Sequence, residues 1–207
     1  MIKFFLFFSL VPFMAFAQSD KKTYKDFFTN LYIQGTYQNG YVFPTNDFVK
    51  GINGESETIS AFHTFSMKIA KQTIGKSEWE QLYNYPYYGI GVSDYDFHNP
   101  EEIGTPIAFY GFLNAPFKRW NKLTFNYEIG FGATFNWKSF NPLTNKYNIA
   151  IGAGQSFLID VGLNLQYNLT EHFDIESGFI LTHFSNGSLK KPNFGLNTII
   201  IEKTKCT

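Results

Sequence analysis

The chain contains four histidines, and one of them, His183, stands two residues before a serine, Ser185. In an extended strand, residues i and i+2 project to the same side, with Cα atoms about 6.5–7 Å apart. An imidazole at that distance can reach the neighbouring hydroxyl and remove its proton, which turns the serine oxygen into a nucleophile. The spacing therefore predicts acyl transfer, with His183 as general base and Ser185 as nucleophile.

The residues that follow include a candidate for the third member of such a site. A turn over residues 190–193 precedes the next predicted strand, and a hairpin symmetric about Lys190 places Asn197 opposite His183. Directly opposed side chains lie about 4.5–5.5 Å apart at Cβ. Asn197 is therefore expected to bind the far imidazole nitrogen and fix its tautomer, as the third residue of a catalytic triad does.

The same turn contains candidate donors for an oxyanion, namely Asn186, Gly187 and Asn193. Such donors stabilise the negative charge that develops on an ester oxygen during hydrolysis. Ordinary turn chemistry is the alternative explanation, because Asn and Gly suit tight turns. Lys190 and Lys191 are candidates for binding lipid phosphates, although solvated turn lysines require no function.

The His-x-Ser spacing also has an interpretation without catalysis. A chain with four histidines and many serines produces this spacing by chance fairly often, and a motif counts only in the right structural context. In that interpretation His183 and Ser185 lie at the rim of a sheet and contact lipid headgroups.

Two segments alternate between apolar and polar residues with the period of a β-strand. In residues 123–137 one face is apolar and aromatic while the other carries Thr, Asn, Glu and Gly, and residues 157–169 repeat the pattern. Both exceed the roughly 5–6 residues of a globular strand and reach the roughly 9–11 residues of a membrane strand. A solvent-facing sheet would carry more Lys and Glu. The pattern favours a membrane barrel over a soluble β-sandwich.

Eight segments are predicted as strands, an even number that matches the smallest membrane barrels. They are residues 31–43, 58–71, 83–97, 103–117, 123–137, 157–169, 173–186 and 195–203. Connections alternate in length, as outer loops and periplasmic turns do, with residues 46–57 and 139–155 long and residues 118–122 and 170–172 short. Aromatic residues near strand ends resemble interfacial girdles, for example Tyr83, Tyr85, Tyr87 and Tyr88. The predicted fold is all-β, an eight-stranded antiparallel transmembrane β-barrel.

The strand predicted over residues 173–186 places the candidate pair on its apolar face. That face runs through Ile175 and Phe179 and leads by twos to His183 and Ser185. The two side chains are therefore predicted on the lipid-facing side of the barrel. An unpaired polar group in hydrocarbon costs several kcal/mol, so this position calls for a functional reason.

The beginning of the chain has the features of a secretory signal peptide. Lys3 supplies a positive start, residues 4–16 form a nearly unbroken apolar run, and Ala15 and Ala17 are the small residues of a cleavage site. A retained anchor helix is the alternative, but the run is shorter than the roughly 20 residues that a transmembrane helix needs. We expect a signal peptide at 1–17 and a single β-barrel domain at 18–207 with a short last strand, located in the bacterial outer membrane.

Composition excludes several other function classes. Lys and Arg number 17, as do Asp and Glu, and no long charged run occurs, so nothing argues for binding nucleic acid. The histidines show no metal-ligand spacing, so neither a metal nor a cofactor is expected. His63 falls on an apolar strand face, where a wall or rim histidine is expected. Cys206 is the only cysteine, so an internal disulfide is not expected.

The candidate site also resembles a known family. Residues 183–187 and 191–197 together resemble the signature of the lipid A 3-O-deacylase (PagL-like) family, whose longer relatives, common in Bacteroidetes, are often described as acyloxyacyl hydrolases. Residues 82–92, 104–116 and 148–152 resemble those relatives as well. The resemblance implies an eight-stranded outer-membrane barrel that hydrolyses an ester-linked acyl chain of lipopolysaccharide without metal or cofactor.

The resemblance also implies a role for each matching residue. His183 matches the family's base, Ser185 its nucleophile and Asn193 a residue of the oxyanion hole, with Gly187 near a donating backbone amide. Asn197 stands where the founding members carry a glutamate. An amide can orient His183 but does not stabilise the imidazolium by charge, so a slower reaction is expected.

The sequence as a whole therefore predicts an outer-membrane serine esterase that removes an ester-linked acyl chain from lipid A. Its expected partner is lipopolysaccharide in the membrane, and a homodimer is left open. The alternative is a non-enzymatic outer-membrane β-barrel that stabilises the membrane or binds a partner through its loops.

Overall fold

The computed structural model describes residues 30–170 and 173–202. The predicted signal peptide at residues 1–17, His172 and Cys206 lie outside the described residues. The predicted last residue of the final strand, residue 203, lies outside them as well.

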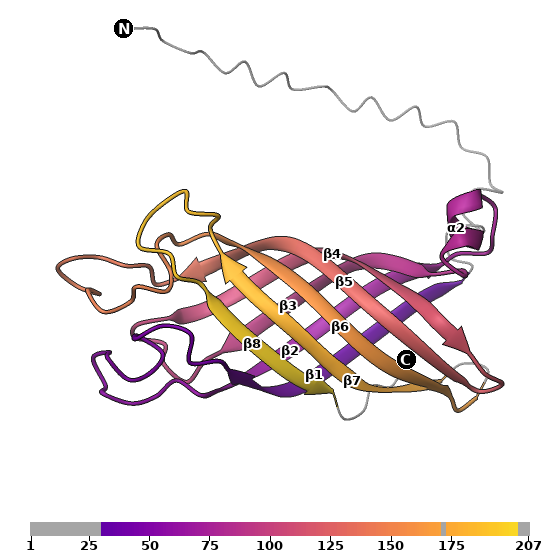
Figure 1. Cartoon of the computed structure of the whole chain (residues 1–207), viewed down its shortest axis with the longest axis horizontal. Coiled ribbons are helices and arrows are strands. Elements are labelled where there is room, and N and C mark those ends of the chain that lie inside the picture. The colour runs from indigo at the N-terminus through magenta and orange to yellow at the C-terminus, as the bar shows by residue number, and fades with distance from the viewer. Residues whose placement is uncertain (1–29, 171–172, 203–207) are drawn as a thin grey trace, which may run out of the picture.

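Eight antiparallel strands form a closed barrel in which each strand pairs with its neighbours along the chain and β8 pairs with β1 (Figure 1). They are β1 (Leu31–Val42), β2 (Ala61–Gln72), β3 (Tyr87–Asp96), β4 (Gly104–Arg119), β5 (Leu123–Trp137), β6 (Ser156–Asn168), β7 (Asp174–Ser185) and β8 (Leu196–Glu202). Each of the eight expected strands occurs. The single closed sheet confirms the predicted eight-stranded barrel and excludes a two-sheet sandwich.

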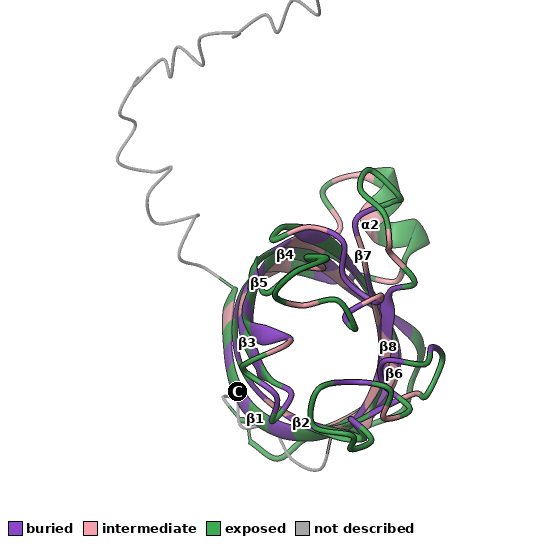
Figure 2. Cartoon of the chain, turned by 90° about the vertical axis from the view of Figure 1, so that its left-hand side faces the viewer, coloured by how far each residue is buried: buried purple, intermediate pink, exposed green. Residues whose placement is uncertain are grey.

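Side chains alternate across the barrel wall, as the period of two requires. On β6, Ile159 and Val161 are exposed on the outer surface, whereas Asp160 and Asn164 are buried inside. The view along the barrel shows the strands as a closed ring with loops gathered at its mouth (Figure 2). An apolar outer surface around a polar interior is the pattern of a barrel surrounded by hydrocarbon.

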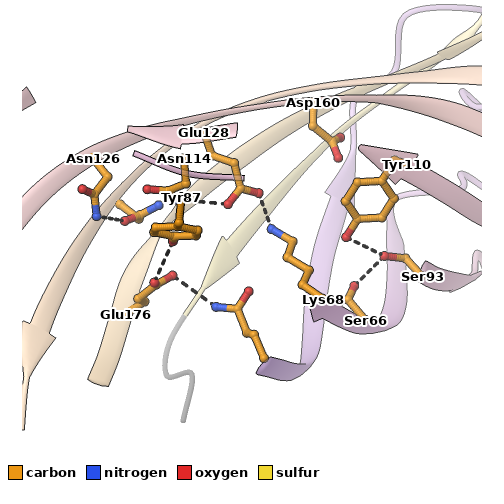
Figure 3. Close-up of polar contacts among 12 residues, drawn as sticks. Ser66, Lys68, Tyr87, Ser93, Tyr110, Asn114, Asn126, Glu128, Asp160 and Glu176 are labelled. Atoms are coloured by element: carbon orange, nitrogen blue, oxygen red, sulfur yellow. Dashed lines mark hydrogen bonds and ion pairs between the residues drawn. The ribbon is translucent and has the colours of Figure 1, made fainter. Parts of the chain in front are cut away.

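Polar side chains cross the lumen and form hydrogen bonds with one another (Figure 3). Lys68 of β2 forms an ion pair with Glu128 of β5, whose second oxygen accepts a hydrogen bond from Asn114. Glu176 of β7 accepts a hydrogen bond from Tyr87 of β3. A cavity beside Lys68 has a volume of about 20 Å³, which is about the space of one water molecule. The lumen is therefore a packed interior in which Lys68 and Glu128 form an ion pair and the other buried carboxylates, Asp160 and Glu176, accept hydrogen bonds.

Aromatic rings close the lumen at the end where the candidate site lies. Phe97 packs against Phe62, Tyr95, Trp137 and Phe184 with ring centroids 5.3–6.2 Å apart. Phe62, Phe97 and Phe184 are fully buried. Because aromatic side chains contribute large buried areas, this cluster anchors the ends of several strands and the loops above them.

The largest difference from the predicted strands occurs at β3, which begins at Tyr87 and not at residue 83. A short helix, α2 (Glu78–Leu82), lies in the connection from β2, and Asn84 and Tyr85 both have a φ of 58°. Left-handed residues followed by Pro86 cannot continue a strand ladder. Tyr87 is buried in the lumen, so its prediction as an interfacial residue was wrong. No helix in the described part of the chain is long and apolar enough to cross a membrane.

The connections divide between the two ends of the barrel. The β1–β2, β3–β4, β5–β6 and β7–β8 loops lie at one end, and α2 lies at the other (Figure 1). The long segments predicted at residues 46–57 and 139–155 therefore lie at the same end, which also carries the end of β7 and the start of β8.

Candidate active site

Three neighbouring strands bring the predicted residues together at the loop end of the barrel. The β7–β8 register pairs His183 directly with Asn197, as the symmetric hairpin predicted. On the other side of β7, β6 places Ile159 opposite His183 and Phe157 opposite Ser185. The histidine and the serine are half-buried and share the outer face of the wall with these apolar side chains.

The His183–Asn197 contact fixes one end of the imidazole. The two atoms His183 Nδ1 and Asn197 Oδ1 are 2.7 Å apart. Because an amide oxygen only accepts hydrogen bonds, Nδ1 carries a proton in this contact, and in the neutral imidazole the lone pair is then on Nε2. The Asn197 amide nitrogen in turn donates to Thr45 Oγ1 at 3.1 Å. The arrangement therefore gives His183 the tautomer that a general base needs.

The hydroxyl oxygen of Ser185 accepts hydrogen bonds from two donors. Asn193 Nδ2 is 2.7 Å from Ser185 Oγ, and the backbone N–H of Gly187 donates to the same oxygen at 3.2 Å. No hydrogen bond between the described side chains of His183 and Ser185 is present, although the two share one face of β7. Catalytic hydrogen bonds in ligand-free sites are often long and tighten only with substrate bound.

Asn186 was predicted as an oxyanion donor, but its hydrogen bonds are made within the loop. Its backbone N–H donates to Asn193 Oδ1 at 3.2 Å, and its side-chain amide donates to the Lys190 carbonyl at 2.9 Å. Both donors are thus directed within the loop and away from the Ser185 hydroxyl. Asn186 orients Asn193 so that the other end of the Asn193 amide points at Ser185.

Two nonpolar residues of the motif, Phe184 and Gly195, help to position His183. Phe184 points into the aromatic cluster and is fully buried, so it holds β7 while the residues on either side face outward. Gly195 has a φ of 77°, and a Cβ there would lie 2.8 Å from His183 Cε1. The sequence contained a signal for Gly195, a glycine just before a strand, but not for its contact with the imidazole. Only glycine fits both the backbone angle and this contact.

An apolar groove runs along the outer wall beside the serine. It has a volume of about 330 Å³ and is lined by Phe131, Phe157, Ile159, His183, Ser185 and Gly187. Phe131 and Phe157 stack with centroids 5.9 Å apart. The groove opens to the outside of the barrel, so an apolar chain lying along this surface would be next to the Ser185 hydroxyl.

The β5–β6 loop is hydrogen-bonded to the β7–β8 loop and holds it in place. The backbone N–H groups of Phe194 and Gly195 donate to the carbonyls of Ile149 and Ala150 at 3.1 and 2.9 Å. A Cβ on Gly152 would lie 2.2 Å from the Lys190 carbonyl oxygen, so this close approach requires glycine. Lys190 and Lys191 are exposed on the outside of the supported loop.

A second histidine–asparagine pair lies on the same outer wall. His63 of β2 is directly opposite Asn39 of β1, and His63 Nδ1 forms a hydrogen bond with Asn39 Oδ1. No group of three or more His, Cys, Asp or Glu residues with the geometry of a metal site occurs in residues 30–170 and 173–202. The expected absence of a metal stays a prediction.

Comparison with known protein families gives one match. The model of the family described as lipid A 3-O-deacylase (PagL) matches residues 63–202, which is more than half of the chain and includes all of β3 to β8. No curated protein and no solved structure matches the chain. The match covers the His183–Asn197 hairpin and leaves out β1 and the β1–β2 loop.

Proposed function

The chain belongs to the lipid A 3-O-deacylase (PagL) family, and on this basis we propose that it is an outer-membrane serine esterase. Its substrate is lipid A of lipopolysaccharide, from which it removes an ester-linked acyl chain. The family match supports the hydrolase class and the substrate. The serine mechanism rests on the geometry around Ser185, and the location rests on the apolar outer surface and the loops of the barrel.

One observation carries the serine mechanism. Ser185 Oγ lies next to an apolar groove and within 2.7 Å of the Asn193 amide, on the same strand face as a histidine whose tautomer Asn197 fixes. A nucleophile, a base, an orienting residue and oxyanion donors are thus within one hairpin. An interfacial histidine and serine without a function would require none of these partners.

In the proposed reaction, Ser185 Oγ attacks the ester carbonyl carbon while its proton passes to His183 Nε2. The oxyanion that forms accepts hydrogen bonds from Gly187 N–H and Asn193 Nδ2. The ester C–O bond then breaks, and His183 returns the proton to the leaving sugar oxygen. Water, deprotonated by His183, then attacks the acyl-serine ester; the bond to Ser185 Oγ breaks, His183 returns the proton to Ser185 Oγ, and the fatty acid is released.

The position of the site fits a substrate that stays in the membrane. The groove faces outward, where the exposed side chains of Phe131, Phe157 and Ile159 would contact acyl chains. The exposed Lys190 and Lys191 lie on the loop beyond the strand end, at the level where lipid A phosphates would lie. Loops of this length face the cell exterior in outer-membrane barrels, and export requires the predicted signal peptide at 1–17.

Mass spectrometry of lipid A tests the proposal directly. Cells that make the wild-type protein should contain lipid A lacking one acyl chain, and cells that make Ser185→Ala should contain unchanged lipid A. Ser177→Ala, on the same outward face of β7 but at its other end, serves as the matched control and should act like the wild type. Heat-modifiable migration would show that each variant is folded.

Two outcomes would contradict the proposal. Full deacylation by Ser185→Ala would exclude Ser185 as the nucleophile. Unchanged lipid A in cells with folded wild-type barrel would favour the alternative of a non-enzymatic barrel that stabilises the membrane or binds a partner.

A further inference from the structure

The segment that directly follows β1 crosses the barrel closure and contacts the start of the last strand. Three hydrogen bonds join the two segments, and each involves Asn197 or Gly195, the two residues that contact or pack against His183. They run from Phe43 N–H to the Asn197 carbonyl at 2.8 Å, from Asn46 Nδ2 to the Gly195 carbonyl at 3.0 Å, and from Asn197 Nδ2 to Thr45 Oγ1 at 3.1 Å. We call residues 43–46 the β1 clasp.

The third contact orients the Asn197 side chain from outside the hairpin. An asparagine amide has one accepting oxygen and one donating NH2 group, so it must be held in a single orientation to serve His183. Thr45 Oγ1 binds the NH2 end and thereby keeps the oxygen on His183 Nδ1. A carboxylate would need no such partner, because both of its oxygens accept.

The β1 clasp is itself fixed by contacts within the first loop. Thr45 N–H donates to the Phe43 carbonyl at 2.8 Å, and buried Asn46 accepts from Val49 N–H at 3.3 Å. Asn46 also binds the carbonyl of Gly195, the residue that packs against the His183 ring. The clasp thus determines the position of two neighbours of the imidazole.

We propose that Thr45 is a positioning residue for the ester hydrolysis described above, on which this inference rests. Its hydroxyl holds the Asn197 amide so that the amide oxygen keeps the proton on His183 Nδ1. Without it, the amide rotates, the proton moves between the ring nitrogens, and His183 Nε2 is available as a base for only part of the time. Thr45 precedes the matched family residues 63–202, so the family match does not include this contact.

A double-mutant cycle with purified protein in detergent micelles tests the role. Thr45→Val should lower kcat by roughly 3- to 10-fold, the effect of one lost neutral hydrogen bond, and leave KM unchanged. Thr45→Ser should restore the rate. In an Asn197→Glu background, Thr45→Val should change kcat by less than about twofold, because either carboxylate oxygen can bind His183.

Thr58→Val is the matched control. Thr58 lies in the same loop and its hydroxyl contacts only the loop, through the Lys50 carbonyl at 3.4 Å, so its replacement should leave kcat unchanged. An equal loss for Thr45→Val in the wild-type background and in the Asn197→Glu background would overturn the inference, and so would no loss in either.

A readout that does not require turnover separates this inference from the proposed function. Nitrogen-15 shifts of His183 in the folded barrel should report a proton on Nδ1 in the wild type and a mixture of both tautomers in Thr45→Val. An identical tautomer in both proteins would refute the positioning role even if the barrel shows no deacylase activity. An inactive wild type with the expected tautomer change would instead refute the proposed function alone.

Discussion

The outer wall of the barrel carries the same cross-strand pair twice. On β7 and β8, His183 lies directly opposite Asn197, and on β2 and β1, His63 lies directly opposite Asn39. In both pairs the histidine Nδ1 contacts the asparagine Oδ1. The two pairs therefore present the same imidazole tautomer to the outside of the barrel.

The surroundings of the two pairs differ at the position two residues further along the strand. After His183 this position is Ser185, whose oxygen lies under the donors of Gly187 and Asn193. After His63 it is Phe65, whose backbone N–H is bound by the Asp94 carboxylate at 2.8 Å. A carboxylate at that place would repel an oxyanion.

The ring contacts of the two histidines differ as well. His63 stacks on Tyr37 at 5.8 Å and meets the His98 ring at 4.4 Å between centroids. His183 instead lies beside the apolar groove, with Gly195 leaving room for its ring. A cross-strand asparagine is thus enough to orient a histidine on the barrel wall. The hydrogen-bond donors to Ser185 Oγ, in contrast, come from the β7–β8 loop.

The largest expected effect separates the two histidines. His183→Ala should lower deacylation by roughly 10²- to 10⁴-fold, the contribution of a general base, and His63→Ala should change it by less than about twofold. Fatty-acid release from lipid A by each purified barrel in micelles measures both. A comparable loss in the two variants would mean that the barrel wall tolerates neither change and that His183 has no special role.

A smaller effect is expected from restoring a charge beside the base. Asn197→Glu should raise kcat roughly fivefold, because hydrogen bonds to charged groups are about 1 kcal/mol stronger than neutral ones. The same change in the other pair, Asn39→Glu, should have no effect on kcat. If Asn197→Glu slows the reaction, the amide is preferred at this position and the charge argument fails.

The smallest effect is expected from copying the serine to the second pair. Phe65→Ser in a Ser185→Ala background recreates the His-x-Ser spacing at His63, yet Asp94 would face the new hydroxyl. We expect no detectable deacylation in the lipid A mass spectrum. Activity in this variant would show that the spacing suffices and that the loop donors are not required.

Local sequence patterns predicted the wall of the barrel and the pairing in the site. The period of two gave the bounds of β5 without error, and hairpin symmetry about Lys190 gave the opposition of His183 and Asn197. Both are properties of residues close together in the chain. The start of β3 was wrong because the aromatic run at residues 83–88 resembles a girdle, while Pro86 and two left-handed residues interrupt the strand.

The contacts that local patterns could not predict join distant segments. Thr45 and Asn197 are 152 residues apart, and their hydrogen bond exists only because β1 meets β8 at the barrel closure. Gly152 likewise approaches Lys190 only through the packing of two loops. For Asn186, the residue type suited an oxyanion donor, but the fold of the loop directs both its donors elsewhere.

Side chains fill most of the middle of this barrel. Porins admit solutes because their wide lumens are filled with water, but here Lys68 and Glu128 pair across the lumen and aromatic rings close one end. A solute in transit would have to separate that buried pair, at a cost of several kcal/mol for each uncompensated charge. A cell can therefore place many copies of such a barrel in a membrane without losing the permeability barrier that the membrane provides.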